Sequence, residues 1–110
     1  MQGTLSRLNF AVLALGLILP GIAQAQGDAA NIFKTNCVLC HGANGSGATT
    51  AGKALKAKDL RSPEVQKQTN AALIKVINEG KGKMPAFADR IEADDMKKLV
   101  AYVRALAKKK

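Results

Sequence analysis

Cys37, Cys40 and His41 form a cluster of side chains that can do chemistry, in the order Cys-Val-Leu-Cys-His. They are the two cysteines and the single histidine of the 110-residue chain. Two thiols at this spacing can each form a thioether with one vinyl group of a haem, and the adjacent imidazole then lies beneath the iron. The pattern predicts one covalently attached haem c, held by Cys37 and Cys40, with His41 as an axial iron ligand.

Three other chemistries compete for these thiols. Cys37 and Cys40 could form a plain disulfide in an exported protein. A thioredoxin-like redox pair needs a preceding strand and a βαβ context, which the sequence does not show. A zinc site needs four ligands, and two cysteines with one histidine fall short unless a carboxylate helps. Haem attachment is favoured because the motif, the single histidine and the export signal described below agree.

A haem that only transfers electrons needs a second axial ligand, and a methionine sulfur in that position raises the reduction potential. Met96 lies on an apolar helical stripe, where methionine usually fills a core. Met84 lies in a loop before Pro85, and this proline keeps it out of helical geometry. We therefore expect Met84 to be the second iron ligand. With both axial positions filled by the protein, no site is open for a substrate, which predicts electron transfer and not catalysis.

The N-terminal residues have the pattern of a secretory signal peptide. A positive charge precedes the apolar stretch Leu8–Leu19, and the small residues Ala23–Ala25 follow it. Signal peptidase reads such small residues, so cleavage is expected before Gln26. The apolar stretch is shorter than the roughly 20 residues that span a bilayer. We expect a cleaved signal peptide over 1–25, a single domain over 26–110, and export to the periplasm or a similar compartment.

Four helical segments are expected to position the chemical residues. Asp28 is suited to cap a helix that ends near Asn36, and Ser62 to cap a short turn before Lys67. The two longer segments have apolar residues at helical spacing. They cover 70–79, which Gly80 would end, and the C-terminal residues from Asp94 onward. Because 49–61 is ambiguous and no segment alternates like a strand, the sequence predicts an all-α domain with long loops.

The chain is strongly basic, with a formal net charge of +9. One interpretation of its lysines is an ordinary solvated surface. The other is a positive ring that steers an acidic partner protein toward the site, and both interpretations stay open. Nucleic acid is disfavoured as a partner because the protein is expected to be exported. The residues concerned flank the loops around the site: Lys53, Lys56, Lys58, Arg61, Lys81 and Lys83.

In Cys37–His41 and Asn78–Arg90 the sequence resembles the class I monohaem cytochromes c, and especially the cytochrome c6 group of small carriers. Phe87 stands where that group often has tryptophan. Tyr102 matches an aromatic residue that such proteins pack against their first helix. The resemblance implies a cytochrome c fold, in which about four helices with long loops surround one covalently bound haem and the first and last helices cross. Many members have a proline after the haem motif that accepts the histidine ring N–H, but this chain has none until Pro63.

The resemblance implies a soluble one-electron carrier, which cycles between ferric and ferrous iron and exchanges electrons with redox partner proteins. We expect a monomer that is at most peripheral to membrane complexes. Two alternatives are a haem c subunit of a larger oxidoreductase and, less favoured, a haem peroxidase or gas sensor with a displaceable Met84. A shell of apolar side chains is expected around the haem: Phe33, Leu39, Leu55, Leu60, Ile74, Ile77, Phe87, Leu99 and Val103.

Overall fold

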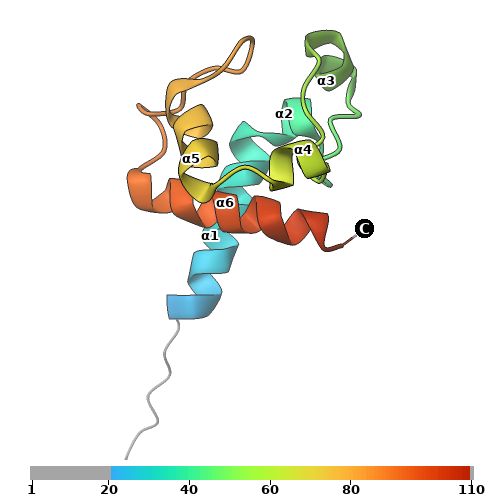
Figure 1. Cartoon of the computed structure of the whole chain (residues 1–110). Coiled ribbons are helices and arrows are strands. Elements are labelled where there is room, and N and C mark those ends of the chain that lie inside the picture. The colour runs from blue at the N-terminus through green and yellow to red at the C-terminus, as the bar shows by residue number, and fades with distance from the viewer. Residues whose placement is uncertain (1–20, 110) are drawn as a thin grey trace, which may run out of the picture.

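The computed structural model describes residues 21–109 of the chain, with side chains described from Asp28 onward. This part contains no strand, and one isolated backbone bridge joins Lys81 to Met84. The expectation of an all-α domain is therefore confirmed over the described residues. Its helices are α1 (Gly21–Asn36), α2 (Val38–His41), α3 (Thr50–Leu55), α4 (Pro63–Gln66), α5 (Asn70–Glu79) and α6 (Ala93–Ala107) (Figure 1).

Helix α1 begins at Gly21 and not at Asp28, the start that the sequence predicts. In the uncut chain the preceding alanines and glutamines have adequate helix propensity, so the helix continues toward the N-terminus. The expected cleavage site before Gln26 falls inside this helix, and residues 1–20 lie outside the described part of the chain. Cleavage therefore stays a prediction. No helix within 21–109 is both long and apolar enough to cross a membrane.

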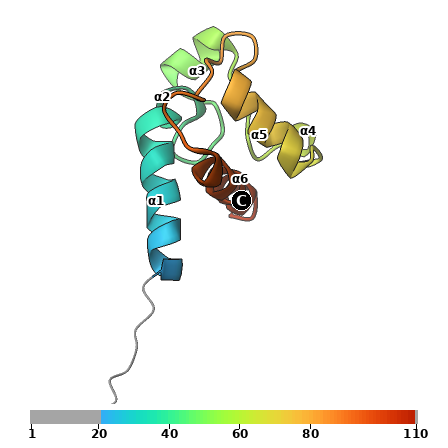
Figure 2. The same cartoon turned by 90° about the vertical axis from the view of Figure 1, so that its left-hand side faces the viewer.

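Helices α1 and α6 cross and form the centre of the fold, as both views show (Figures 1 and 2). Ala29 and Phe33, one turn apart on α1, are 3% and 2% exposed. The Phe33 ring packs on Tyr102 of α6, with ring centroids 5.0 Å apart and a tilt of 41° between the rings. This contact confirms that Tyr102 packs against the first helix.

The apolar stripe of α6 is the largest contribution to the buried core. Its buried residues recur at helical spacing, as the sequence predicted. Phe87 and Ile91, from the segment before α6, complete this core together with Phe33. The stripe consists of Met96, Leu99, Val100, Val103 and Leu106.

Two helices, α2 and α3, were not predicted, and they change the assignment of two core residues. Leu39 and Leu55 were expected in the apolar shell, but they are 76% and 41% exposed. Leu39 lies two positions after Cys37 and so points away from it on a helical turn. Leu55 is the last residue of the short helix α3 and is partly open to solvent. The other expected shell residues are buried or packed against the core.

Arg104 joins α6 to the segment between α4 and α5. One guanidinium nitrogen donates to the Gln66 carbonyl at 2.9 Å. A second nitrogen, Nη2, donates to the Gln68 carbonyl at 2.6 Å and to Asn70 Oδ1 at 2.8 Å. Thr69, between these acceptors, caps α5 by accepting from the Ala72 N–H at 3.0 Å. This network fixes one wall of the cavity described next.

Candidate cofactor site

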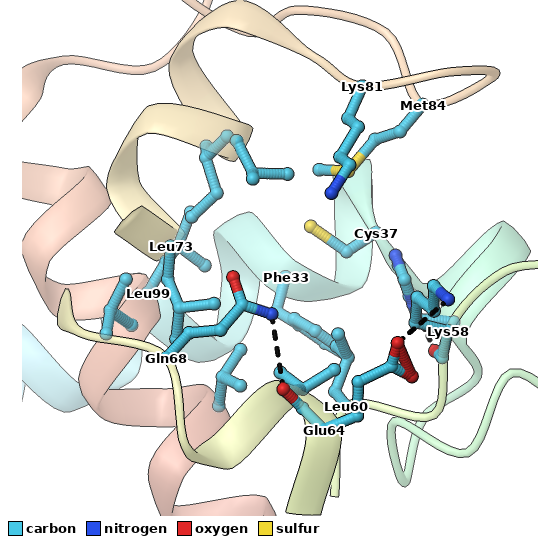
Figure 3. A pocket seen from close by; sticks show the side chains of 16 residues that line it. Phe33, Cys37, Lys58, Leu60, Glu64, Gln68, Leu73, Lys81, Met84 and Leu99 are labelled. Atoms are coloured by element: carbon cyan, nitrogen blue, oxygen red, sulfur yellow. Dashed lines mark hydrogen bonds and ion pairs between the residues drawn. The ribbon is translucent and has the colours of Figure 1, made fainter. Parts of the chain in front are cut away.

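A cavity of about 240 Å³ lies between α1, α4, α5 and α6 (Figure 3). Most of its lining is apolar and includes Phe33 of α1, Ile77 of α5 and Leu99 of α6. Its remaining lining includes Cys37, His41 and Met84. The structure therefore brings three of the four predicted site residues to one cavity. The fourth, Cys40, is half-buried on α2 beside His41 and is outside the lining.

The His41 ring is oriented by a backbone carbonyl. Its Nδ1 lies 3.0 Å from the carbonyl oxygen of Lys58. A carbonyl can only accept, so Nδ1 carries the proton and donates, which leaves the Nε2 lone pair free to bind a metal. Lys58 thus provides the acceptor that the sequence could not identify. No sequence signal could have found it, because every residue has a carbonyl and the contact depends on the loop after α3.

Thr49 holds the C-terminal end of α2, the helix that contains Cys40 and His41. Its Oγ1 lies 2.7 Å from the Leu39 carbonyl and 3.1 Å from the Cys40 carbonyl, and it accepts from the Gly52 N–H at 2.8 Å. The Gly47 N–H donates to the His41 carbonyl at 2.7 Å. These contacts satisfy the free carbonyls at the end of α2 and hold the helix in place. The threonine before α3 is a residue type that commonly caps helices, so this helix start could have been read from the sequence.

The two cysteines have different surroundings. They are not joined to each other by a disulfide. The Cys37 sulfur points into the cavity in Figure 3, and burial raises the pKa of this thiol to about 11. The apolar surroundings of Cys37 thus disfavour its charged thiolate form.

Met84 reaches the cavity from a tight turn after α5 (Figure 3). Lys81 and Met84 exchange two backbone hydrogen bonds, each of 3.0 Å. Gly80 enters the turn with φ +80°, and a Cβ there would lie 2.7 Å from the Met84 carbonyl oxygen. Only glycine fits this combination of conformation and close approach. Met96, the other candidate ligand, is 2% exposed in the core and does not line the cavity.

These residues fit a haem. A cavity with mostly apolar walls suits a flat macrocycle, and imidazole and thioether are common axial ligands of haem iron. A bare metal ion has less support: within 21–109 no three His, Cys, Asp or Glu side chains are grouped so that they could hold one. The observation that carries the fit is the meeting of Cys37, a free His41 Nε2 and Met84 at one cavity.

Comparisons with known proteins agree with this fit. The family model described as "Cytochrome C oxidase, cbb3-type, subunit III" matches residues 24–103. Cytochrome c6 of Microcystis aeruginosa is 38% identical over 82 residues, which are 74% of this chain and 98% of that protein. Cytochrome c6 of Cladophora glomerata is 37% identical over 82 residues, 74% of this chain and 88% of that protein. A solved structure, "KustC0563 c-type cytochrome", has a TM-score of 0.66 at 31% identity and covers 72% of this chain and 96% of its own.

The helical fold around a cavity with a Cys-x-x-Cys-His motif defines a c-type cytochrome of class I. Within that class, the chain belongs to the cytochrome c family as a cytochrome c6-like member. It therefore carries one covalently bound haem c with its iron. It is not an enzyme but an electron-transfer protein, and it interacts with redox partners. The relatives do not favour the two alternative functions, a subunit of a larger complex and a peroxidase or gas sensor.

Proposed function

We propose that Cys37 and Cys40 hold the haem by thioether bonds, and that His41 and Met84 are its axial ligands. The bound haem iron supplies the chemistry, the uptake and release of one electron. The observation that carries the assignment is that Cys37, His41 and Met84 line one apolar cavity, whereas Met96 is enclosed in the core.

The chain's own residues prepare both axial positions. The Lys58 carbonyl fixes the tautomer and direction of the His41 ring, and donation from Nδ1–H makes Nε2 a better ligand. On the opposite side, the turn between Lys81 and Met84 holds the methionine backbone by paired hydrogen bonds. These contacts hold the His41 ring and the Met84 backbone in fixed positions.

The proposed partners are proteins with an acidic docking face. Between Asp28 and Asp59 the sequence contains no acidic residue but several lysines. Lys56, Lys81 and Lys83 are exposed. Same-sign charge around a cavity raises the rate of encounter with an oppositely charged protein, and salt reduces that rate. The carrier would work as a monomer, at most peripheral to membrane complexes.

Export to a periplasm-like compartment completes the proposal, with 1–25 removed as a signal peptide and 26–110 retained as the cytochrome domain. A mature chain that begins at Gln26 leaves Asp28 close to the start of α1, where an acidic residue is favourable. The intact mass of the protein purified from its own cells measures this directly. A mass that includes residues 1–25 would contradict cleavage.

The ligand assignment is tested by replacing each methionine with leucine, which has a similar volume. Met84→Leu should abolish the sulfur-to-iron charge-transfer absorption of the ferric protein, lower the reduction potential and let added imidazole bind. Met96→Leu is the matched control and should leave the absorption and the potential nearly unchanged, because that side chain only fills the core. The reverse result, with the absorption lost in Met96→Leu alone, would refute Met84 as the ligand.

A further inference from the structure

We propose that Lys58 and Glu64 form a charge-balanced pair beside the cavity, and that the two charges shift the reduction potential of the bound haem in opposite directions. The proposal rests on the proposed function, because it requires the haem to occupy this cavity. It concerns residues outside the ligand set, on the loop after α3 and on α4.

The pair is formed at the edge of the cavity. Lys58 Nζ lies 3.2 Å from Glu64 Oε1, and both residues line the cavity (Figure 3). Their side chains are 63% and 61% exposed. An ion pair this exposed contributes little to folding stability. Folding stability therefore does not explain why Lys58 and Glu64 are paired here. The position of the pair beside the haem cavity offers a more direct explanation.

Glu64 is the one acidic side chain among the described residues that line the cavity. Lys58 and Lys81 are the lysines in that lining. Without Glu64, the charged side chains in this lining would all be positive. Glu64 offsets one of them, so that the positive surface can attract a partner without its full effect reaching the iron.

Lys58 also contacts the proposed iron ligand His41 through its backbone. Its carbonyl accepts from His41 Nδ1 at 3.0 Å, while its ammonium group binds Glu64. The side-chain charges can therefore be removed without removing the carbonyl that orients the ring. This separates an electrostatic role of the pair from the positioning role of the backbone.

The sign of each effect follows from electrostatics. Ferric iron carries one more positive charge than ferrous iron, so a nearby cation favours the ferrous state and raises the potential, and a nearby anion lowers it. Because both side chains are largely exposed, solvent and salt screen both effects. Both shifts should therefore shrink as ionic strength rises.

The test measures the reduction potential of the holoprotein in single and double variants. Glu64→Gln should raise the potential, Lys58→Gln should lower it, and the double variant should return close to the wild-type value. Glu64→Asp and Lys58→Arg keep the charges and should also stay close to it. Glu92→Gln is the matched control, because it removes an exposed acid outside the cavity lining and should shift the potential less than Glu64→Gln.

Two outcomes would overturn the proposal: shifts of the same sign in both single variants, or a Glu64→Gln shift no larger than that of Glu92→Gln. Failure of the proposed function is seen separately, in the wild-type protein. A chain without covalent haem, or one whose absorption survives Met84→Leu, would refute the assignment of the site. A normal haem spectrum with unshifted potentials would refute only the role of the pair.

Discussion

Replacing Arg104 with alanine should destabilise the protein more than any other single change on the polar face of α6. The substitution removes donors to the Gln66 and Gln68 carbonyls and to the Asn70 side chain. A hydrogen bond from a charged group contributes about 1.5–3 kcal/mol, and partial access of water to these acceptors reduces the sum. We expect a loss of about 2–4 kcal/mol in the free energy of unfolding. For a domain of this size each kcal/mol lowers Tm by about 4–8 °C, so Tm should fall by at least roughly 8 °C.

The assay is thermal and denaturant unfolding of the holoprotein, followed by haem absorption and far-UV circular dichroism. Arg104→Lys keeps the charge but loses the forked geometry, so it should retain only part of the stability. Lys97→Ala, on the same helix with a side chain 71% exposed, is the control and should change the free energy of unfolding by less than about 0.5 kcal/mol. If Arg104→Ala unfolded like Lys97→Ala, the wall between α4 and α5 would not depend on this network.

Three further changes test the packing around the site. Gly80→Ala should weaken the methionine–iron absorption and lower the free energy of unfolding by about 1–3 kcal/mol, since its Cβ would meet backbone atoms. Gly82→Ala is the control, because Gly82 also has a positive φ but open space around it, and it should lower the free energy of unfolding less. Equal losses of stability in the two variants would contradict the close approach at Gly80. Gly52→Ala should lower the yield of the holoprotein because its Cβ would clash with the Cys40 carbonyl, and a normal yield would count against close packing of α3 on α2. Leu99→Ala, buried at 2% exposure, should lower the free energy of unfolding by about 2–5 kcal/mol in denaturant melts, and a loss below 1 kcal/mol would contradict its place in the core.

The parts of the fold that could be predicted are those encoded by local patterns. The stripe on α6, the cap at Ser62 and the irregular turn around Met84 depend on near neighbours in sequence, and the structure has all three. Leu39 and Leu55 were misplaced because composition alone does not distinguish a buried leucine from an exposed one on a short helix.

The contacts that complete the site are of another kind. Arg104 looks like an ordinary surface residue in the sequence, and its acceptors are carbonyls more than thirty positions away. The role of the Lys58 carbonyl could not be predicted either, since a backbone group carries no sequence signal. Glu64 has no distinguishing signal in the sequence, because its place beside the cavity follows from how α4 packs. Such contacts depend on tertiary structure and could not be predicted from spacing.

The most direct test of the central claim is mass spectrometry of a tryptic digest of the protein matured with cytochrome c assembly machinery. The peptide Thr35–Lys53 contains Cys37, Cys40 and His41. We predict that this peptide carries the mass of one haem and that neither cysteine reacts with an alkylating reagent. A peptide of unmodified mass with alkylated cysteines, or one with a Cys37–Cys40 disulfide, would contradict the assignment of the haem to this site.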